Sequence, residues 1–334
     1  MYGLLRRVNK HYSCNPKLLW ELFDKMIMPI AMYNVEVWGT ICFPCNKNND
    51  DFLNVSNTKN PIEDIQTKFG KRVLAVNDRC TNWAVLTECG RTPTITTIMK
   101  NMISFWLHLA NSQNPIMKAA LQTNADLSLV KNVNSWFSFL SRILKFLGLE
   151  HLLYTSDVQE INLKVKGIKR ILQQKAVENW QNLHEKTSGR QDTKLGLFCK
   201  IKTEFGMSTY LSAPLTFKER RAITKLRTSS HNLPIETDRY EGIDNRSHRL
   251  CPLCNETTGD EAHYLTECSF EPFVRLRTPL LSLVCNKSQN FPSLSRDDKA
   301  TLLLDNPDIQ VLSQVGKVAH EIMVTFTDMN SAKR

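Results

Sequence analysis

Residues 246–277 of this chain read RSHRLCPLCNETTGDEAHYLTECSFEPFVRLR. The stretch contains a Cys-x2-Cys-x8-His-x4-Cys pattern made by Cys251, Cys254, His263 and Cys268. Two cysteines with two residues between them can turn both sulfurs toward one point, and the histidine and third cysteine can complete a tetrahedron. Four protein ligands leave no open coordination position, which is typical of a structural zinc site. The spacing therefore predicts one structural Zn2+ site, with unmetallated thiols as the alternative.

Catalytic zinc chemistry is not expected at this site. A zinc deaminase would carry His-x-Glu upstream of Pro-Cys-x-x-Cys, whereas His263 follows the cysteine pair. The neighbouring acids Asp260 and Glu261 are expected to support the site from outside or to face solvent.

Other catalytic patterns are missing as well. The chain has no phosphate-cradling glycine loop, no Gly-x-Ser-x-Gly elbow and no His-Glu-x-x-His helix. Two adjacent carboxylate pairs, Asp50-Asp51 and Asp297-Asp298, could in principle hold magnesium. Each follows a polar stretch rather than an apolar strand, so we expect both pairs to face solvent. We predict no catalytic residues and no enzymatic activity.

Composition indicates an intracellular protein, and its charge suits an anionic partner, with a soluble basic protein that has no such partner as the alternative. The 334 residues include 43 basic and 33 acidic side chains, a net charge of +10, which suits RNA or DNA. The 10 cysteines accompany a start that does not resemble a signal peptide, so metal binding is favoured over disulfides. No apolar run reaches about 18 residues, so no membrane span is predicted. We expect a nuclear or cytoplasmic protein that is not secreted and has no membrane partner.

Helical periodicity dominates the remainder of the sequence. Apolar residues recur every three or four positions from Ile161 to Leu183, which predicts one amphipathic helix of about 25 residues. Similar stripes occupy residues 17–28 and 312–326. The predicted fold is mainly α, with helical bundle segments and a small structural zinc module near the C-terminus.

Basic side chains gather before and around the zinc pattern. The segment FKERRAITKLRTSSH carries five of them, and further arginines flank the cysteines on both sides. Such a segment favours sequence-independent phosphate contact, with a solvated charged face as the alternative. The residues predicted in this way to bind nucleic acid are Lys218, Arg220, Arg221, Lys225, Arg227, Arg246, Arg249, Arg275 and Arg277.

Several runs together resemble a known family. They are ITKLRTSSHNLPIETDRY at 223–240, RLCPLCN at 249–255, GDEAHYLTEC at 259–268 and VRLR at 274–277. These resemble the zinc-binding C-terminal region of LINE-type, non-LTR retrotransposon polyproteins. Upstream, LFDKMIMPIAMYNVEVWG at 22–39 resembles the start of the thumb that follows the reverse-transcriptase palm, and residues 71–94 resemble its continuation.

The resemblance implies a role in nucleic-acid binding. It implies metal binding by the four Cys and His ligands and contact with RNA or DNA around Arg227 and His231. Arg239 lies in Asp238-Arg239-Tyr240, where the family has Gly-Arg-Tyr. The implied partners are RNA, DNA and the rest of a retrotransposon ribonucleoprotein.

The polymerase itself has no counterpart in this sequence. The family's aromatic-x-Asp-Asp motif is absent, because Asn48 and Ser295 stand where the aromatic residue should precede the two aspartate pairs. The predicted regions are 1–95, thumb-like; 96–210, helical; 211–280, basic segment and zinc module; and 281–334, a helical tail. The alternative function is a structural or protein-interaction zinc module, in a domesticated or inert remnant.

Overall fold

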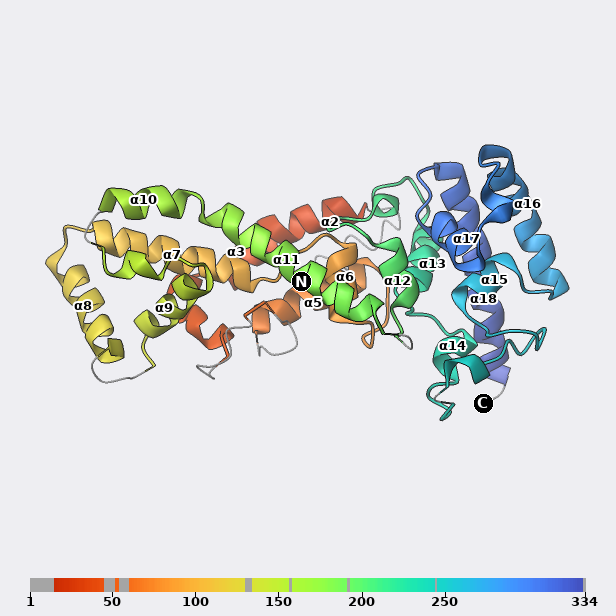
Figure 1. Ribbon diagram of the computed structural model, residues 1–334, viewed down its shortest axis with the longest axis horizontal. Coiled ribbons are helices and arrows are strands. Elements are labelled where there is room, and N and C mark those ends of the chain that lie inside the picture. The colour runs from red at the N-terminus through yellow and green to blue at the C-terminus, as the bar shows by residue number, and fades with distance from the viewer. Residues whose placement is uncertain are drawn as a thin grey trace. The chain divides into compact units, whose positions relative to one another are not determined.

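The computed structural model describes residues 15–44, 52–53, 60–129, 134–155, 158–190, 193–243 and 245–332. Within these ranges every regular element is a helix (Figure 1). Strand pairing in the described residues is limited to two isolated antiparallel bridges, Cys89 with Met207 and Leu250 with Thr258. The predicted mainly α fold is therefore confirmed.

The chain forms two compact units, and each is assembled from separated segments. Unit 1 comprises the described residues of Met1–Glu21, Lys68–Gly90 and Leu183–Arg334. Unit 2 comprises those of Leu22–Thr67 and Arg91–Asn182. These units reflect which residues lie close together in space. They do not test the four consecutive regions predicted from the sequence, which remain a prediction.

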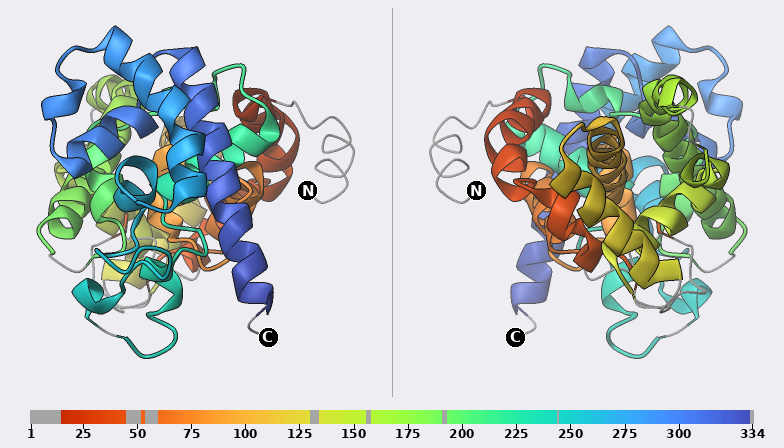
Figure 2. Two further views of the ribbon diagram at one scale, coloured as in Figure 1. Left: turned by 90° about the vertical axis from the view of Figure 1, so that its right-hand side faces the viewer. Right: turned by 90° about the vertical axis from the view of Figure 1, so that its left-hand side faces the viewer.

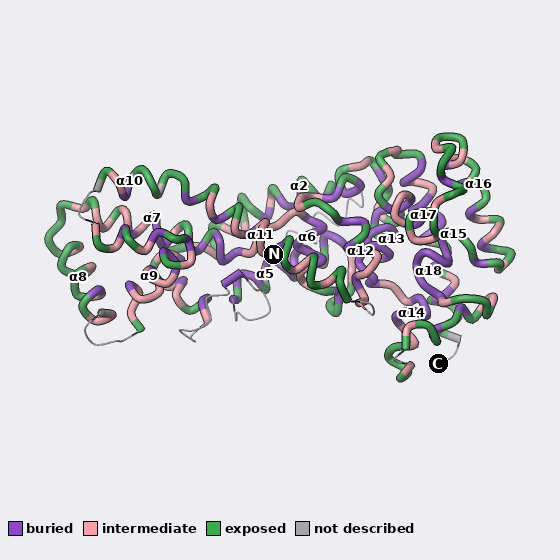
Figure 3. Tube along the Cα trace, in the orientation of Figure 1, coloured by how far each residue is buried: buried purple, intermediate pink, exposed green. Residues whose placement is uncertain are grey.

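Unit 2 is built around α7 (Ile95–Asn111), whose apolar face is buried (Figure 3). This helix packs against α4 (Val35–Trp38), α8 (Pro115–Leu129), α9 (Trp136–Phe146) and α10 (Val158–Lys166). Ile98, Met99 and Ile103 have no exposed surface, as expected for a helix packed on several sides. The start of α7 is fixed by Glu63, whose Oε2 accepts hydrogen bonds of 2.6 Å from both the backbone N and the Oγ1 of Thr94.

The predicted long helix after residue 160 is interrupted. Helix α10 ends at Lys166, Gly167 forms a turn, and α11 runs from Ile168 to Ser188. The apolar stripe itself is as predicted, since Ile161, Ile168 and Leu172 are buried. Glycine loses more conformational freedom in a helix than other residues do, which favours a break at this position. Periodicity alone does not detect the interruption, because the stripe continues across it.

Unit 1 holds the basic segment and the cysteine-rich module. Its central pair is α13 (Phe217–Arg227) and the long helix α18 (Ile309–Ala332), which lie side by side (Figure 2). They approach closely at Gly316, where a Cβ would lie 2.8 Å from the Cα of Glu219. Helix α13 begins with a capping box formed by Thr216 and Glu219. Around this pair lie α6 (Asn82–Glu88), α12 (Gly196–Ile201), α15 (Glu261–Thr266), α16 (Glu271–Lys287) and α17 (Arg296–Leu304).

A buried ion pair links three of these helices. The Nε of Arg227 lies 2.6 Å from the Oε1 of Glu88, and both side chains are fully buried. The same guanidinium donates to the backbone O of Leu304 and to Oδ1 of Asp305, each at 3.0 Å, and lies 4.9 Å from the ring centroid of Tyr210. Arg227 therefore joins α6, α13 and the end of α17. The prediction that it contacts nucleic acid is wrong, because no part of its side chain reaches the surface.

Replacing Arg227 by methionine should destabilise unit 1 strongly. The change would leave the Glu88 carboxylate buried without its cation, which typically costs about 3–5 kcal/mol. Denaturant unfolding followed by circular dichroism measures the loss. The matched control is Arg221→Met on the exposed face of the same helix, where a change within about 0.5 kcal/mol is expected. Equal stability of the two variants would contradict the structural role.

The same pair predicts acid sensitivity. Burial raises the pKa of Glu88, but the charge and hydrogen bonds of Arg227 outweigh it and hold the pKa below the ordinary 4.5. A carboxylate with a lowered folded-state pKa stabilises the fold above pH 4.5, and this stabilisation is lost as the pH falls below that value. The double variant Glu88→Gln/Arg227→Met should show a shallower decline in the free energy of unfolding between about pH 5 and pH 3. An unchanged decline would exclude Glu88 as its source.

Candidate metal centre and basic surface

A short hairpin brings the first two cysteines together. Leu250 and Thr258 form an antiparallel bridge, and the backbone N of Cys251 donates to the O of Thr257 at 2.8 Å. Between the two arms, the N of Asn255 donates to the O of Cys251 at 2.8 Å, and Asn255 adopts the left-handed conformation with φ 57°. Asparagine tolerates this conformation better than most residues. The tight turn therefore directs both thiols of the Cys-x2-Cys pair to the same side.

Helix α15 supplies the other two ligands. Asp260 caps its start, because Oδ1 accepts a 2.9 Å hydrogen bond from the backbone N of His263. Beyond the last turn, the N of Cys268 donates to the O of His263 at 3.0 Å. His263 in the first turn and Cys268 just past the end are thus linked by a backbone hydrogen bond.

The four predicted ligands meet at one point. Their ligand atoms lie within 4.8 Å of one another, and all are buried except the partly exposed Cys254. The Sγ atoms of Cys251 and Cys268 are 3.8 Å apart, and the Sγ of Cys254 is 3.4 Å from Nε2 of His263. A tetrahedral zinc ion with S ligands at about 2.3 Å requires sulfurs roughly 3.8 Å apart. The group could therefore hold a metal ion.

His263 is arranged as a neutral ligand. Its Nδ1 lies 2.9 Å from Oγ1 of Thr257, which leaves Nε2 to face the cysteines. Burial, followed by the positive charges of Arg296 and Arg277, lowers the pKa of His263 to about 4. The imidazole is therefore unprotonated at neutral pH, as metal binding requires. The role of Thr257 was not predicted, since hydroxyl residues are common in loops and only the fold places this one beside the ring.

The Cys268 thiol needs a nearby cation to ionise at neutral pH. Burial raises the pKa of Cys268 to about 12. Metal binding at such a position displaces a proton and stabilises the thiolate, so it is coupled to folding of the module.

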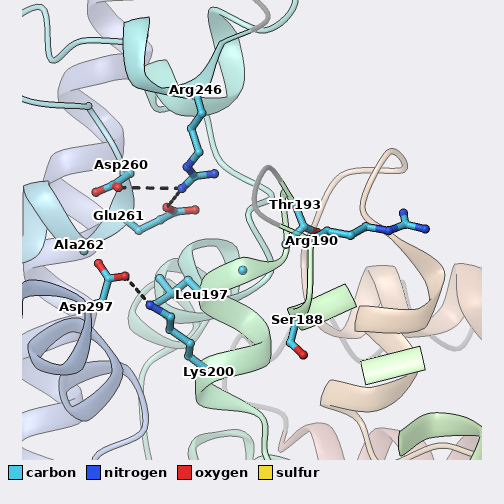
Figure 4. Close-up of a pocket in the computed structure, with 11 residues that line it drawn as sticks. Ser188, Arg190, Thr193, Leu197, Lys200, Arg246, Asp260, Glu261, Ala262 and Asp297 are labelled. Carbon is cyan, nitrogen blue, oxygen red and sulfur yellow. Dashed lines mark hydrogen bonds and ion pairs between the residues drawn. The ribbon is translucent and has the colours of Figure 1, made fainter. Parts of the chain in front are cut away.

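A pocket of about 260 Å3 lies beside the module within unit 1 (Figure 4). On one wall Nη2 of Arg246 faces Asp260 at 3.9 Å and Glu261 at 4.0 Å. On the other, Lys200 pairs with Asp297 at 2.5 Å. Positive and negative groups alternate around the pocket and largely balance. Arg246, one of the predicted nucleic-acid contacts, is thus half-buried and directed toward these two carboxylates.

The aspartate pairs do not form a metal site in the described residues. Asp297 and Asp298 lie in the first turn of α17, where the backbone N of Asp298 donates to Oγ of the capping residue Ser295 at 3.2 Å. Asp298 is exposed and Asp297 is half-buried, in partial agreement with the solvent-facing prediction. Asp50 and Asp51 lie outside the described residues.

Three more predicted nucleic-acid contacts are buried arginines. Arg220 donates from Nη2 to the backbone O of Leu215 at 3.0 Å, and Arg249 donates from Nη1 to the O of Ile235 at 2.7 Å. Arg277 is 6% exposed. The prediction of surface contact is wrong for these three residues, because all three are buried in the protein interior.

His231 is also committed to an internal contact. Its Nε2 lies 2.7 Å from Oε1 of Glu261, and its Nδ1 accepts from the backbone N of Leu233 at 3.3 Å. The His231 side chain has no exposed surface, so its predicted role in contacting nucleic acid is wrong. Glu261 also accepts from Oγ of Ser229 at 2.9 Å. This pair joins the loop after α13 to the helix that carries His263, one of the candidate metal ligands.

The remaining predicted basic residues are exposed, apart from the half-buried Lys225. Arg239 is exposed, and Arg275 is exposed and pairs with Glu271. Lys218, Arg221 and Lys225 follow one another at intervals of three and four residues, so they share one side of α13, here called the basic face. In the described part of the chain none of these three forms an ion pair. Burial and, after it, the positive charge of Arg221 lower the pKa of Lys225.

No protein-family model, curated protein or solved structure matches this chain. Across the residues that the structure describes, no helix is both long and apolar enough to cross a membrane.

Proposed function

We propose that this chain is a nucleic-acid-binding, non-catalytic C-terminal fragment of a LINE-type retrotransposon reverse transcriptase, stabilised by one structural zinc ion. The observation that carries nucleic-acid binding is the basic face of α13, where Lys218 and Arg221 are exposed, Lys225 is half-buried, and none of the three has an ion-pair partner among the described residues. Cations arranged in this way contact phosphates without reading sequence. The partners are RNA or DNA and the rest of a retrotransposon ribonucleoprotein.

Zinc is the metal that best fits the candidate centre. Three thiolates and one imidazole in tetrahedral arrangement suit Zn2+, and four protein ligands fill its coordination shell. When bound, the ion would supply folding free energy to the module rather than chemistry. All eight described cysteines are free thiols, which suits a reducing nuclear or cytoplasmic compartment.

Purified protein should contain about one zinc per chain by mass spectrometry, and Cys254→Ala should lose it. Cys285→Ala is the matched control, because Cys285 is a half-buried thiol on α16 outside the ligand group. Circular dichroism should show that most helix content survives in Cys254→Ala. Zinc retained by Cys254→Ala at the level of the control would contradict the tetrahedral assignment.

Nucleic-acid binding should weaken with salt in proportion to the number of phosphates contacted. We expect Lys218→Gln/Arg221→Gln/Lys225→Gln to reduce the slope of log K against log salt by about 2–3, since each phosphate contact contributes roughly 0.7–0.9. Single-stranded and duplex forms of RNA and DNA should each be titrated. The control Lys100→Gln/Lys118→Gln/Lys145→Gln removes the same charge from exposed positions of unit 2. If the affinity of the unaltered protein does not change with salt concentration, the proposal is wrong.

A structural or protein-interaction module is the second candidate. It is favoured by the burial of Arg220, Arg227, Arg249, Arg277 and His231, which removes five predicted contacts from the surface. Nucleic-acid affinity that is unchanged by the triple substitution in α13 would favour this candidate.

A further inference from the structure

An exposed tyrosine of unit 1 is in contact with two arginines. Tyr240 is 60% exposed, and the Cζ atom of Arg79 lies 5.4 Å from the centroid of its ring. The Cζ atom of Arg239 lies 5.9 Å from the same centroid. Both arginines are exposed, and neither forms a salt bridge with any residue that the structure describes. The three side chains form one accessible group, here called the Tyr240 cluster.

Buried hydrogen bonds fix the loop that carries Tyr240. The loop follows the short helix α14 (Pro234–Thr237). The guanidinium of the buried Arg249 donates to the backbone O of Ile235 at 2.7 Å and to the backbone O of Ile243 at 2.9 Å. One arginine therefore holds the segment on both sides of Tyr240, at the base of the cysteine hairpin. The ring is presented to solvent from a loop with fixed ends.

Arg79 comes from a distant segment that is fixed by its own contacts. The Nζ of Lys71 donates to the backbone O of Asp78 at 2.7 Å, and the backbone N of Asn77 donates to Oγ of Ser230 at 3.2 Å. Cation–π contacts at exposed sites are weak, so the contact of Arg79 with the ring is not needed to hold either loop in place. The fold brings the three side chains together and leaves them open to a ligand.

A group of this kind suits an unpaired nucleobase. Bases of single strands stack on aromatic rings and on guanidinium planes, whereas bases inside a duplex are already stacked on one another. The exposed carboxylates of Asp78 and Glu241 lie next in sequence to Arg79 and Tyr240 and offset the charges of the two arginines. The Tyr240 cluster therefore offers flat surfaces without an excess of positive charge, in contrast to the basic face of α13.

We infer that the Tyr240 cluster is a stacking site for an unpaired base of single-stranded RNA or DNA. The inference rests on the proposed nucleic-acid binding and adds to it a preference for single strands. The basic face of α13 contacts phosphates, which single strands and duplexes both carry. The Tyr240 cluster contacts a base only where the strand is unpaired.

The test measures binding to the full chain by fluorescence anisotropy. The probes are a single-stranded RNA and a single-stranded DNA of one sequence, the corresponding duplexes, and a DNA strand of equal length that lacks bases. We expect Tyr240→Ala to weaken binding of the two single strands by about fivefold or more, as loss of one stacked base does. Affinity for the duplexes and for the abasic strand should stay within about twofold of the unaltered chain.

Two control variants separate the ring from other effects. Tyr240→Phe keeps the aromatic face and should retain the affinity for single strands. Tyr33→Ala removes a tyrosine that is 73% exposed in unit 2 and should leave all affinities unchanged. The slope of log K against log salt should be the same in Tyr240→Ala as in the unaltered chain, because the substitution removes no cation.

Failure of this inference can be told apart from failure of the proposed function. Suppose that the unaltered chain binds and that the triple substitution in α13 lowers the salt slope, but that Tyr240→Ala binds single strands within about twofold of the unaltered chain. The stacking site is then wrong and the proposed function stands. An equal loss of affinity for single strands, duplexes and the abasic strand would also overturn the stacking site. If the unaltered chain binds none of the probes at about 50 mM salt, both are wrong.

Discussion

The buried contact between Arg227 and Glu88 is the constraint on which unit 1 depends. The two residues are 139 positions apart in sequence, yet their charged atoms approach to 2.6 Å in the interior. A buried ion pair is tolerated only when further hydrogen bonds satisfy the donors and acceptors that the two charged groups do not use with each other. Here Leu304, Asp305 and Ser208 complete the arrangement around the guanidinium. The position of α13, and therefore the direction of its basic face, follows from this network.

The cysteine-rich module is attached to the same frame through a second set of polar contacts. His231, just after α13, pairs with Glu261 at the start of α15, and Arg249 at the base of the hairpin donates to carbonyl groups of Ile235 and Ile243. The module itself has few apolar residues between its ligands, so a metal ion would take the place of a missing core. Basic residues thus have two different uses in this region. Some make buried hydrogen bonds that hold segments together, and others lie on the basic face of α13.

The sequence predicted the features that depend on local pattern. The ligand set was identified because its four members lie within 18 residues and their spacing satisfies one geometry. Mainly helical structure followed from apolar periodicity. The burial of the arginines was harder to predict. Helical spacing places Arg227 on the side of α13 that carries Ile223, away from Arg221, but the buried partner that neutralises Arg227 is Glu88 from a distant segment. The break at Gly167 was missed for a related reason, since both helices continue the same apolar stripe.

The interleaved order of the two units limits how this protein can be divided. The segment Lys68–Gly90 belongs to unit 1 although residues of unit 2 flank it on both sides. It contributes Glu88, and the N of Asn77 donates to Oγ of Ser230 at 3.2 Å. A fragment beginning at residue 211 would contain every metal ligand and the whole of α13, but it would bury Arg227 without its partner. Moving α13 together with the cysteine motif to a new protein would therefore also require the distant helix that ends at Glu88.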